Sequence, residues 1–159
     1  MAVLAACSQV ISPFGKTVPD VPGFDVLSLE RHNCFFGTCP VYTLRISADG
    51  DVHFIAKDHV TVTGPHDGRL SPDDLARLSA ALRRVAFETL RERYVSEGDG
   101  CVDVMTDQPS LAITVKRGRT SKTVRLYLGC QGPDVPSEEL TRLAQTMDAI
   151  TGTRNRDVP

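Results

Sequence analysis

The feature that most constrains this chain is its odd number of cysteines. Five cysteines are spread over 159 residues, so at least one of them has no partner for a disulfide within the chain. Cys7 stands alone near the beginning, and the remaining four fall in the later part of the sequence, at Cys34, Cys39, Cys101 and Cys130. The count therefore separates an N-terminal segment with one thiol from a region that has enough cysteines for two bridges.

The first cysteine lies in a motif that resembles a bacterial lipobox. Leu4-Ala5-Ala6-Cys7 places small residues before a thiol, as a signal peptidase requires when that thiol receives a diacylglycerol. The segment before Cys7 has six residues and no charged side chain. It is shorter than a usual signal peptide. We therefore interpret residues 1–7 as a remnant of a lipoprotein signal peptide and expect the true start codon to lie upstream. The alternative is an alanine-rich N-terminus with a free thiol.

The residues that follow have the composition of a tether. Prolines and glycines interrupt any periodicity over residues 8–23, as expected of a flexible linker. We predict a single folded domain over residues 24–152 and a loose tail over 153–159, which is consistent with the length of the chain.

Composition excludes several functional classes. The net charge of −2 does not favour a nucleic-acid surface. The chain has no apolar run long enough for a membrane-spanning helix. Aromatic residues make up 6% of the chain and tryptophan is absent, which disfavours an aromatic stacking platform. The hydrophobic fraction of 41% supports a folded core.

The first half of the predicted domain has the pattern of an antiparallel meander. Tyr42, Leu44 and Ile46 alternate with polar residues, and Asp49-Gly50 after them is a strong hairpin signal. We expect the strand after the return strand to stop at Gly64-Pro65. The strands predicted here are residues 24–31, 41–48, 52–57 and 59–63.

Two helices and a second hairpin are predicted further along. Ser71-Pro72-Asp73-Asp74 combines a serine N-cap, a proline at the first position and acidic residues in the first turn. Gly152 is expected to end the second helix. The apolar stripes are Leu75, Leu78, Leu82 and Val85, then Leu140, Leu143, Met147 and Ile150.

The order of these elements predicts an α+β fold. Residues 111–115 and 124–128 alternate like paired strands around a turn at Arg117–Ser121. Strand hairpins that alternate with amphipathic helices favour an antiparallel sheet with two helices packed on one face, a two-layer sandwich.

The pair Cys34 and Cys39 allows three interpretations. It can form a structural disulfide, a redox-active pair or half of a metal site. Redox pairs usually have two intervening residues at a helix N-terminus, whereas four intervene here and a strand follows. A zinc site would need a second pair of ligands, and Cys101 and Cys130 have no close Cys or His beside them. An exported protein would favour disulfides.

If Cys7 is set aside, four cysteines allow three pairings. Local order favours Cys34–Cys39 and Cys101–Cys130, since Cys130 follows a strand whose partner is entered from the Cys101 segment. On the loop-entropy model the longer ring contributes about 3.5 kcal/mol and the shorter ring about 2 kcal/mol.

The sequence Cys34-Phe35-Phe36-Gly37-Thr38-Cys39-Pro40-Val41-Tyr42-Thr43-Leu44, with Asp49-Gly50 and Thr106-Asp107-Gln108-Pro109, resembles the bacterial domain-of-unknown-function family 6438. Members of that family carry a C-F-G-x-C-P-x-Y-x-L motif, a D-G hairpin and a later T-D-x-P, and most are small and secreted or lipoprotein-like. The resemblance covers about residues 25–150. It implies a fold and export but no catalytic residue. The family usually has three residues between these two cysteines, whereas Phe35 and Phe36 here make it four.

The cysteine loop is also the candidate binding surface. We expect at least one of its two phenylalanines to pack in the core, the alternative being exposure of both on a rigid ring. The arginine before the loop could bind an anion or pair with Glu30 or Asp49. Two histidines, His53 and His59, fall on adjacent predicted strands, where a metal pair is conceivable. The candidate binding residues are Arg31, Phe35, Phe36, Tyr42 and Asp107.

These patterns predict an exported, lipid-anchored domain of the bacterial cell envelope with a non-enzymatic binding or accessory role. The expected partner is an envelope protein or a small ligand, with no nucleic acid, no cofactor, and membrane contact through the lipid alone. The alternatives are a thiol-redox enzyme using Cys34 and Cys39, with Arg31 or His32 lowering a thiol pKa, and a metal-binding domain.

Overall fold

The computed structural model describes residues 22–60 and 64–153. Most of the predicted signal remnant and tether, with Cys7, lies outside these residues. The strands are β1 (Val26–His32), β2 (Val41–Ser47), β3 (Asp51–Asp58), β4 (Gly64–Arg69), β5 (Arg93–Tyr94), β6 (Asp103–Val104), β7 (Ser110–Arg117), β8 (Thr120–Tyr127) and β9 (Cys130–Gln131). The helices are α1 (Pro72–Val85) and α2 (Ser137–Thr151), with short 3₁₀ turns at Phe87–Thr89 and Glu97–Asp99.

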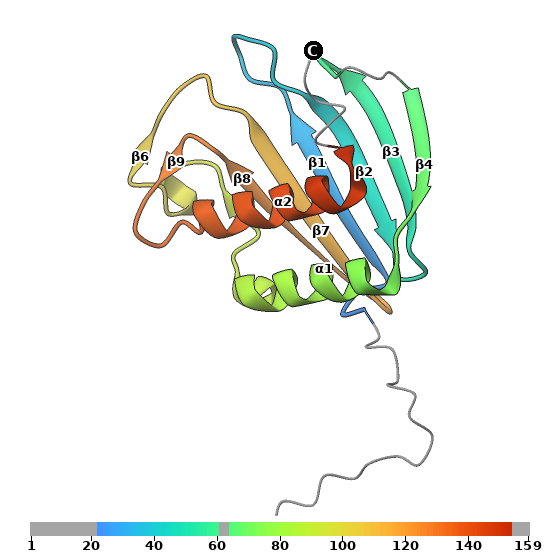
Figure 1. The fold of residues 1–159 in the computed structure, drawn as a ribbon. Helices are drawn as coiled ribbons and strands as arrows, with labels where there is room; N and C mark the ends of the chain where they lie inside the picture. Colours follow the sequence, from blue (N-terminus) through green and yellow to red (C-terminus); the bar gives the residue numbers. More distant parts are fainter. Residues whose placement is uncertain (1–21, 61–63, 154–159) are drawn as a thin grey trace, which may run out of the picture.

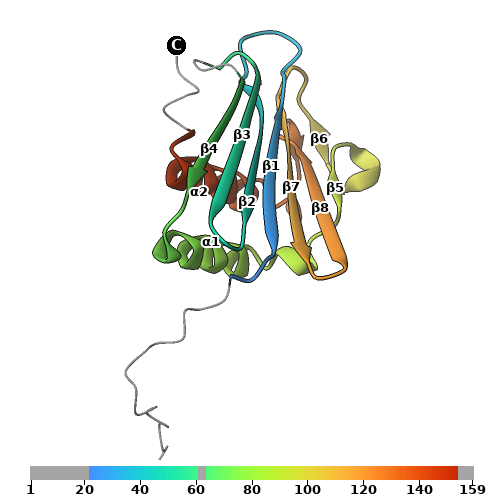
Figure 2. The same cartoon turned by 90° about the vertical axis from the view of Figure 1, so that its right-hand side faces the viewer.

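A seven-stranded sheet forms one layer, in the order β4-β3-β2-β1-β7-β8-β5. Its neighbours are antiparallel except for the short β5, which runs parallel to β8. Both helices cover one face of this sheet (Figure 1). Among the described residues no helix lies over the other face, which is seen obliquely in Figure 2. The predicted α+β sandwich is confirmed.

The core fills the space between the sheet and the two helices. The predicted alternation places Tyr42, Leu44 and Ile46 of β2 inside, and Leu78 of α1 and Leu143 of α2 meet them from the helical layer. Each such side chain contributes roughly 1.5–3 kcal/mol when it is fully buried. This burial is what fixes the helices to one face of the sheet.

Helix α1 begins as the sequence predicts. The amide of Asp74 donates to the Ser71 hydroxyl at 3.2 Å, and the Asp74 carboxylate accepts from the Ser71 amide at 3.4 Å, which completes a capping box. The hydrogen bond from the Ser71 hydroxyl lowers the pKa of the Asp74 carboxyl. Helix α2 ends at Gly152, whose φ of 72° is the left-handed conformation that favours glycine.

The strand predicted over residues 59–63 is wrong in position. His59 and Val60 lie outside any strand, and β4 pairs with β3 through Gly64–Arg69, so the strand begins where it was expected to stop. Residues 61–63 are outside the described part of the chain. An edge strand tolerates proline and glycine because one side of its backbone needs no partner. The sequence of β4 therefore resembles a turn and does not predict a strand.

Strand direction gives the domain two distinct ends. β1 begins beside residues 24–25, where the chain enters the domain, and ends at the loop of residues 33–40. We call these the entry end and the loop end. His32 pairs with Ser110, so the connection from β6 to β7 also lies at the loop end, beside the 33–40 loop (Figures 1 and 2).

Neither α1 nor α2 is long and apolar enough to cross a bilayer, and the same holds for every other helical turn in the described residues.

Candidate functional site

A disulfide closes the loop between β1 and β2. Cys34 and Cys39 are joined with an S–S distance of 2.02 Å and a Cα–Cα distance of 5.7 Å. Gly37, within the ring, has a φ of 113°, which a residue with a Cβ rarely adopts. The predicted disulfide therefore forms, and it holds the loop as a small ring that joins two central strands.

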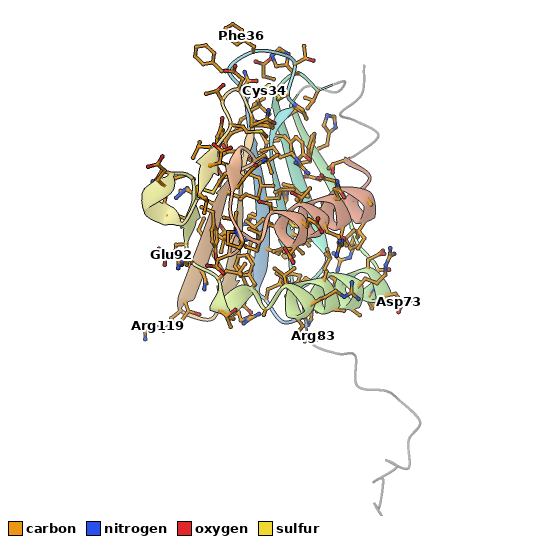
Figure 3. All side chains as sticks on the ribbon, turned by 90° about the vertical axis from the view of Figure 1, so that its left-hand side faces the viewer. Cys34, Phe36, Asp73, Arg83, Glu92 and Arg119 are labelled. Atoms are coloured by element: carbon orange, nitrogen blue, oxygen red, sulfur yellow. A yellow bond between two sulfur atoms is a disulfide. The ribbon has the colours of Figure 1, made fainter. Side chains whose placement is uncertain are left out.

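Both phenylalanines of the ring point into solvent. Phe35 is 82% exposed and Phe36 is 73% exposed, and their rings meet edge to face with centroids 4.8 Å apart. The expectation that at least one packs in the core is wrong. Cys34 takes the inward position, and the exposed phenylalanines follow it in the bend at residues 35–37. Figure 3 shows Phe36 pointing outward at the loop end.

A second disulfide holds the neighbouring segment. Cys101 and Cys130 are joined with a Cα–Cα distance of 5.2 Å, beside the two-stranded pairing of β6 with β9. The amide of Met105 donates to the carbonyl of Gly129 at 2.9 Å. A Cβ on Gly129 would lie 2.1 Å from the Met105 carbonyl oxygen, so only glycine allows this close approach.

Asp107 lies in the turn that leads into β7, also at the loop end. Its side chain is exposed and its φ is 61°, a left-handed conformation that aspartate tolerates better than most residues. The next amide, that of Gln108, donates to the Tyr127 hydroxyl at 3.1 Å. The turn residue predicted from sequence therefore lies at the loop end, in the connection that runs beside the 33–40 loop (Figures 1 and 2).

Tyr42 is buried and Arg31 is partly buried, and both lie on strands outside the exposed loop. The Arg31 guanidinium donates to the Asp148 carboxylate at 2.6 Å and to the Tyr42 hydroxyl at 2.7 Å. The Tyr42 hydroxyl in turn donates to Asp148 at 2.6 Å. The partners expected for Arg31, Glu30 or Asp49, are replaced by a residue from α2.

The charge of this cluster is balanced inside the fold. Burial acts to lower the pKa of the Arg31 guanidinium, but the Asp148 carboxylate and the Tyr42 hydroxyl outweigh it and raise that pKa. Thr153 is also buried, and its hydroxyl donates to Asp148 at 3.1 Å. Thr153, the first residue of the predicted tail, is therefore held in this cluster, and residues 154–159 lie outside the described part of the chain.

The two cations considered as activators of a redox-active pair have other partners. Arg31 is directed to Asp148, and the His32 imidazole lies 3.8 Å from the Glu30 carboxylate. Both cations are therefore paired with carboxylates. The loop also connects two strands, whereas a redox-active pair usually precedes a helix.

The histidines considered as metal ligands have separate partners. The His53 imidazole lies 2.6 Å from the Asp67 carboxylate on β4, and His59 lies 3.4 Å from Asp58. Among the described residues, no three His, Cys, Asp or Glu side chains converge in a way that could hold a metal ion.

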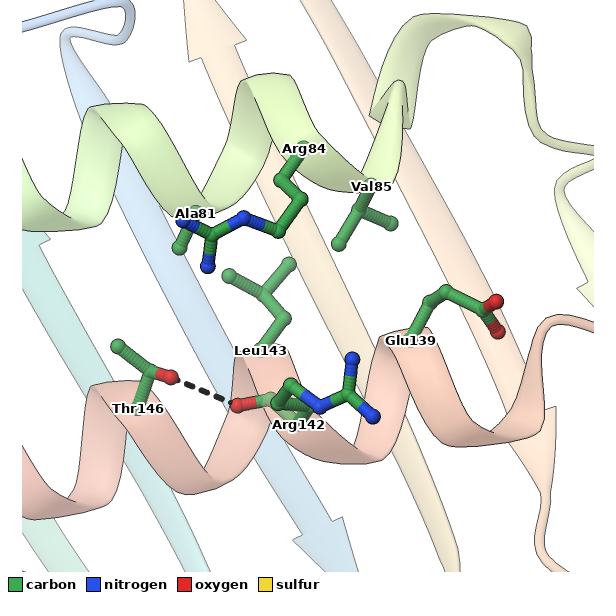
Figure 4. Close-up of a pocket in the computed structure, with 7 residues that line it drawn as sticks. All are labelled: Ala81, Arg84, Val85, Glu139, Arg142, Leu143 and Thr146. Carbon is green, nitrogen blue, oxygen red and sulfur yellow. Dashed lines mark hydrogen bonds between the residues drawn. The ribbon is translucent and has the colours of Figure 1, made fainter.

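A pocket lies between α1 and α2 (Figure 4). Within it the Thr146 hydroxyl donates to the Arg142 carbonyl at 2.8 Å. The Arg142 guanidinium lies 3.8 Å from Glu138 and is largely exposed. An exposed ion pair of this kind contributes little to stability. The lining residues are Ala81, Arg84, Val85, Glu139, Arg142, Leu143 and Thr146.

The fold and the site together define a class: a two-layer α+β domain with two disulfides at one end, which presents exposed aromatic side chains on a closed ring. A comparison with protein families matches residues 25–151 to the domain of unknown function DUF6438. The chain therefore belongs to this family, as its cysteine motif predicts. A comparison with curated proteins gave no match.

Proposed function

We propose that this chain is an exported, lipid-anchored domain of the bacterial cell envelope that binds another envelope component through the Cys34–Cys39 ring, without catalysing a reaction. The observation that carries this proposal is the exposure of Phe35 and Phe36 on a ring closed by a disulfide. Large exposed apolar groups that lie together are uncommon on monomeric proteins and mark interaction sites.

The energetics of the ring suit binding. Each phenylalanine can bury about 150–250 Å², and full burial of such a side chain is worth roughly 1.5–3 kcal/mol. The disulfide and the bend at Gly37 restrict the backbone before any partner arrives. A preformed loop loses less conformational entropy on binding, and more of the burial energy therefore appears as affinity.

Two disulfides support the exported location. Cys34–Cys39 is in a partly exposed loop and Cys101–Cys130 is buried. Disulfides persist in oxidising compartments and are rare in the bacterial cytosol. With these four cysteines paired, Cys7 is the one thiol of the sequence left to receive a lipid.

We predict that the protein expressed from its native locus begins at a lipid-modified Cys7. Intact-mass measurement should show the mass of a diacylglycerol and four fewer hydrogens than the reduced chain, because both bridges are closed. A Cys7→Ser variant should move from the membrane fraction to the extracytoplasmic soluble fraction. An unmodified Met1 together with four free thiols would contradict the proposed location.

We predict that a photo-crosslinking amino acid at position 36 captures a partner in the living cell. The matched control is the same amino acid at position 55, because Ile55 is 47% exposed but lies on the uncovered face of the sheet. A discrete product from position 36, lost in a Phe35→Ser background, is the expected result. Equal products from both positions, or none from position 36, would count against the ring as the binding surface.

A further inference from the structure

We infer that the partner is a protein whose surface offers an apolar pocket bordered by lysine or arginine side chains. We infer also that it contacts two segments at once: the Cys34–Cys39 loop and the chain between Cys101 and β7. This inference rests on the proposed binding role of the ring. To that proposal it adds a second contact surface on this chain and the sign of the charge on the partner.

The second contact is the chain between Cys101 and β7. Val102 is 74% exposed and Met105 is 43% exposed. The connection that contains Met105 lies beside the Cys34–Cys39 loop (Figures 1 and 2). Four of the five large exposed apolar side chains among the described residues therefore belong to these two segments. We call the set Phe35, Phe36, Val102 and Met105 the apolar end.

Acidic groups accompany the apolar end. Asp103 and Asp107 lie two residues before and two residues after Met105 in the second segment, and both side chains are exposed. Asp58, whose carboxylate lies 3.4 Å from the His59 imidazole, ends β3 at the same end. Arg31, the cation nearest the ring in sequence, is already neutralised by Asp148. An apolar centre with a charged rim is the usual anatomy of a protein interface, and this rim requires positive charge from the partner.

The geometry disfavours a lipid surface as the occupant. An anionic bilayer repels an acidic rim. The apolar end is also separated from the entry end by the length of β1, which over seven residues is about 20 Å. A lipid on Cys7 would be joined through residues 8–23 to the entry end, which is the end opposite the apolar end.

The test uses the purified full chain and two defined probes: a random peptide library displayed on phage, and vesicles of phosphatidylglycerol or phosphatidylcholine. We expect the selected peptides to combine aliphatic or aromatic residues with lysine or arginine. Asp103→Asn/Asp107→Asn should raise their Kd about tenfold at low salt and flatten its salt dependence. Met105→Ser should also weaken binding of the selected peptides. Asp73→Asn on α1 is the control, and it should leave their Kd unchanged.

The possible outcomes separate this inference from the proposed function. Peptides that are apolar but carry no cations, or that ignore the Asp103 and Asp107 changes, would overturn the basic rim while leaving the ring as a binding surface. Vesicle binding that depends on Phe35 and Phe36 would replace the protein partner with a membrane. If no peptide is retained, the inference falls, and crosslinking at position 36 decides the proposed function independently.

Discussion

Replacing Asp148 with alanine is expected to lower the free energy of unfolding by about 3–5 kcal/mol. Asp148 is 4% exposed and accepts hydrogen bonds from Arg31, Tyr42 and Thr153. Its removal leaves a largely buried guanidinium without a counter-charge and a buried phenol without its acceptor. Urea unfolding followed by circular dichroism would measure the loss.

A matched variant distinguishes the unpaired charge from the lost packing. Arg31→Met/Tyr42→Phe/Asp148→Leu replaces three polar members of the cluster with apolar groups of similar size, which in other buried ion pairs is close to neutral. The Thr153 hydroxyl can still donate to the backbone carbonyl of residue 148. It should recover most of the stability lost by Asp148→Ala. If the triple variant is as unstable as the single one, the cluster contributes through shape and not through its charge.

Removal of the Cys101–Cys130 bridge is the second large effect. Cys101→Ala/Cys130→Ala should lower the free energy of unfolding by about 3.5 kcal/mol, because the bridge closes a ring over a sequence separation of 29 residues. Both cysteines are also buried in the core cluster, so the substitution adds a small packing loss. Thermal and urea unfolding of the paired variants would measure the effect.

The shorter ring provides the comparison. Cys34→Ser/Cys39→Ser should cost about 2 kcal/mol on the same model, because the separation is only 5 residues. It should weaken partner binding more than it weakens the fold, since the ring presents the phenylalanines. An equal stability loss for both pairs would mean that loop length does not govern their contribution.

Most of the sheet and both helices could be predicted because their signals are local. The alternation of Tyr42, Leu44 and Ile46 shows a half-buried strand directly, and Ser71 with Pro72 marks the start of α1. Strand β4 carries no such pattern. Its position depends on pairing with β3, a tertiary contact that overrides the turn-like residues at Gly64 and Gly68.

The candidate site was only partly predictable, for a related reason. The cysteine spacing gave the ring, but nothing local decides whether Phe35 points in or out once Cys34 is held inward. Asp148 was missed although a weak signal exists: it falls four residues after the buried Ala144, on the apolar stripe of α2. An acid on such a stripe requires a buried partner, and Arg31 lies 117 residues away in sequence.

The central position of β1 has a mechanical consequence. A lipid at the entry end and a partner on the ring at the loop end would pull on this strand from opposite directions along its own axis. β1 is held on both sides by antiparallel ladders to β2 and β7, so the load would be shared by many backbone hydrogen bonds in shear at once. The domain would then transmit tension between the membrane and its partner through β1 and the two strands paired with it.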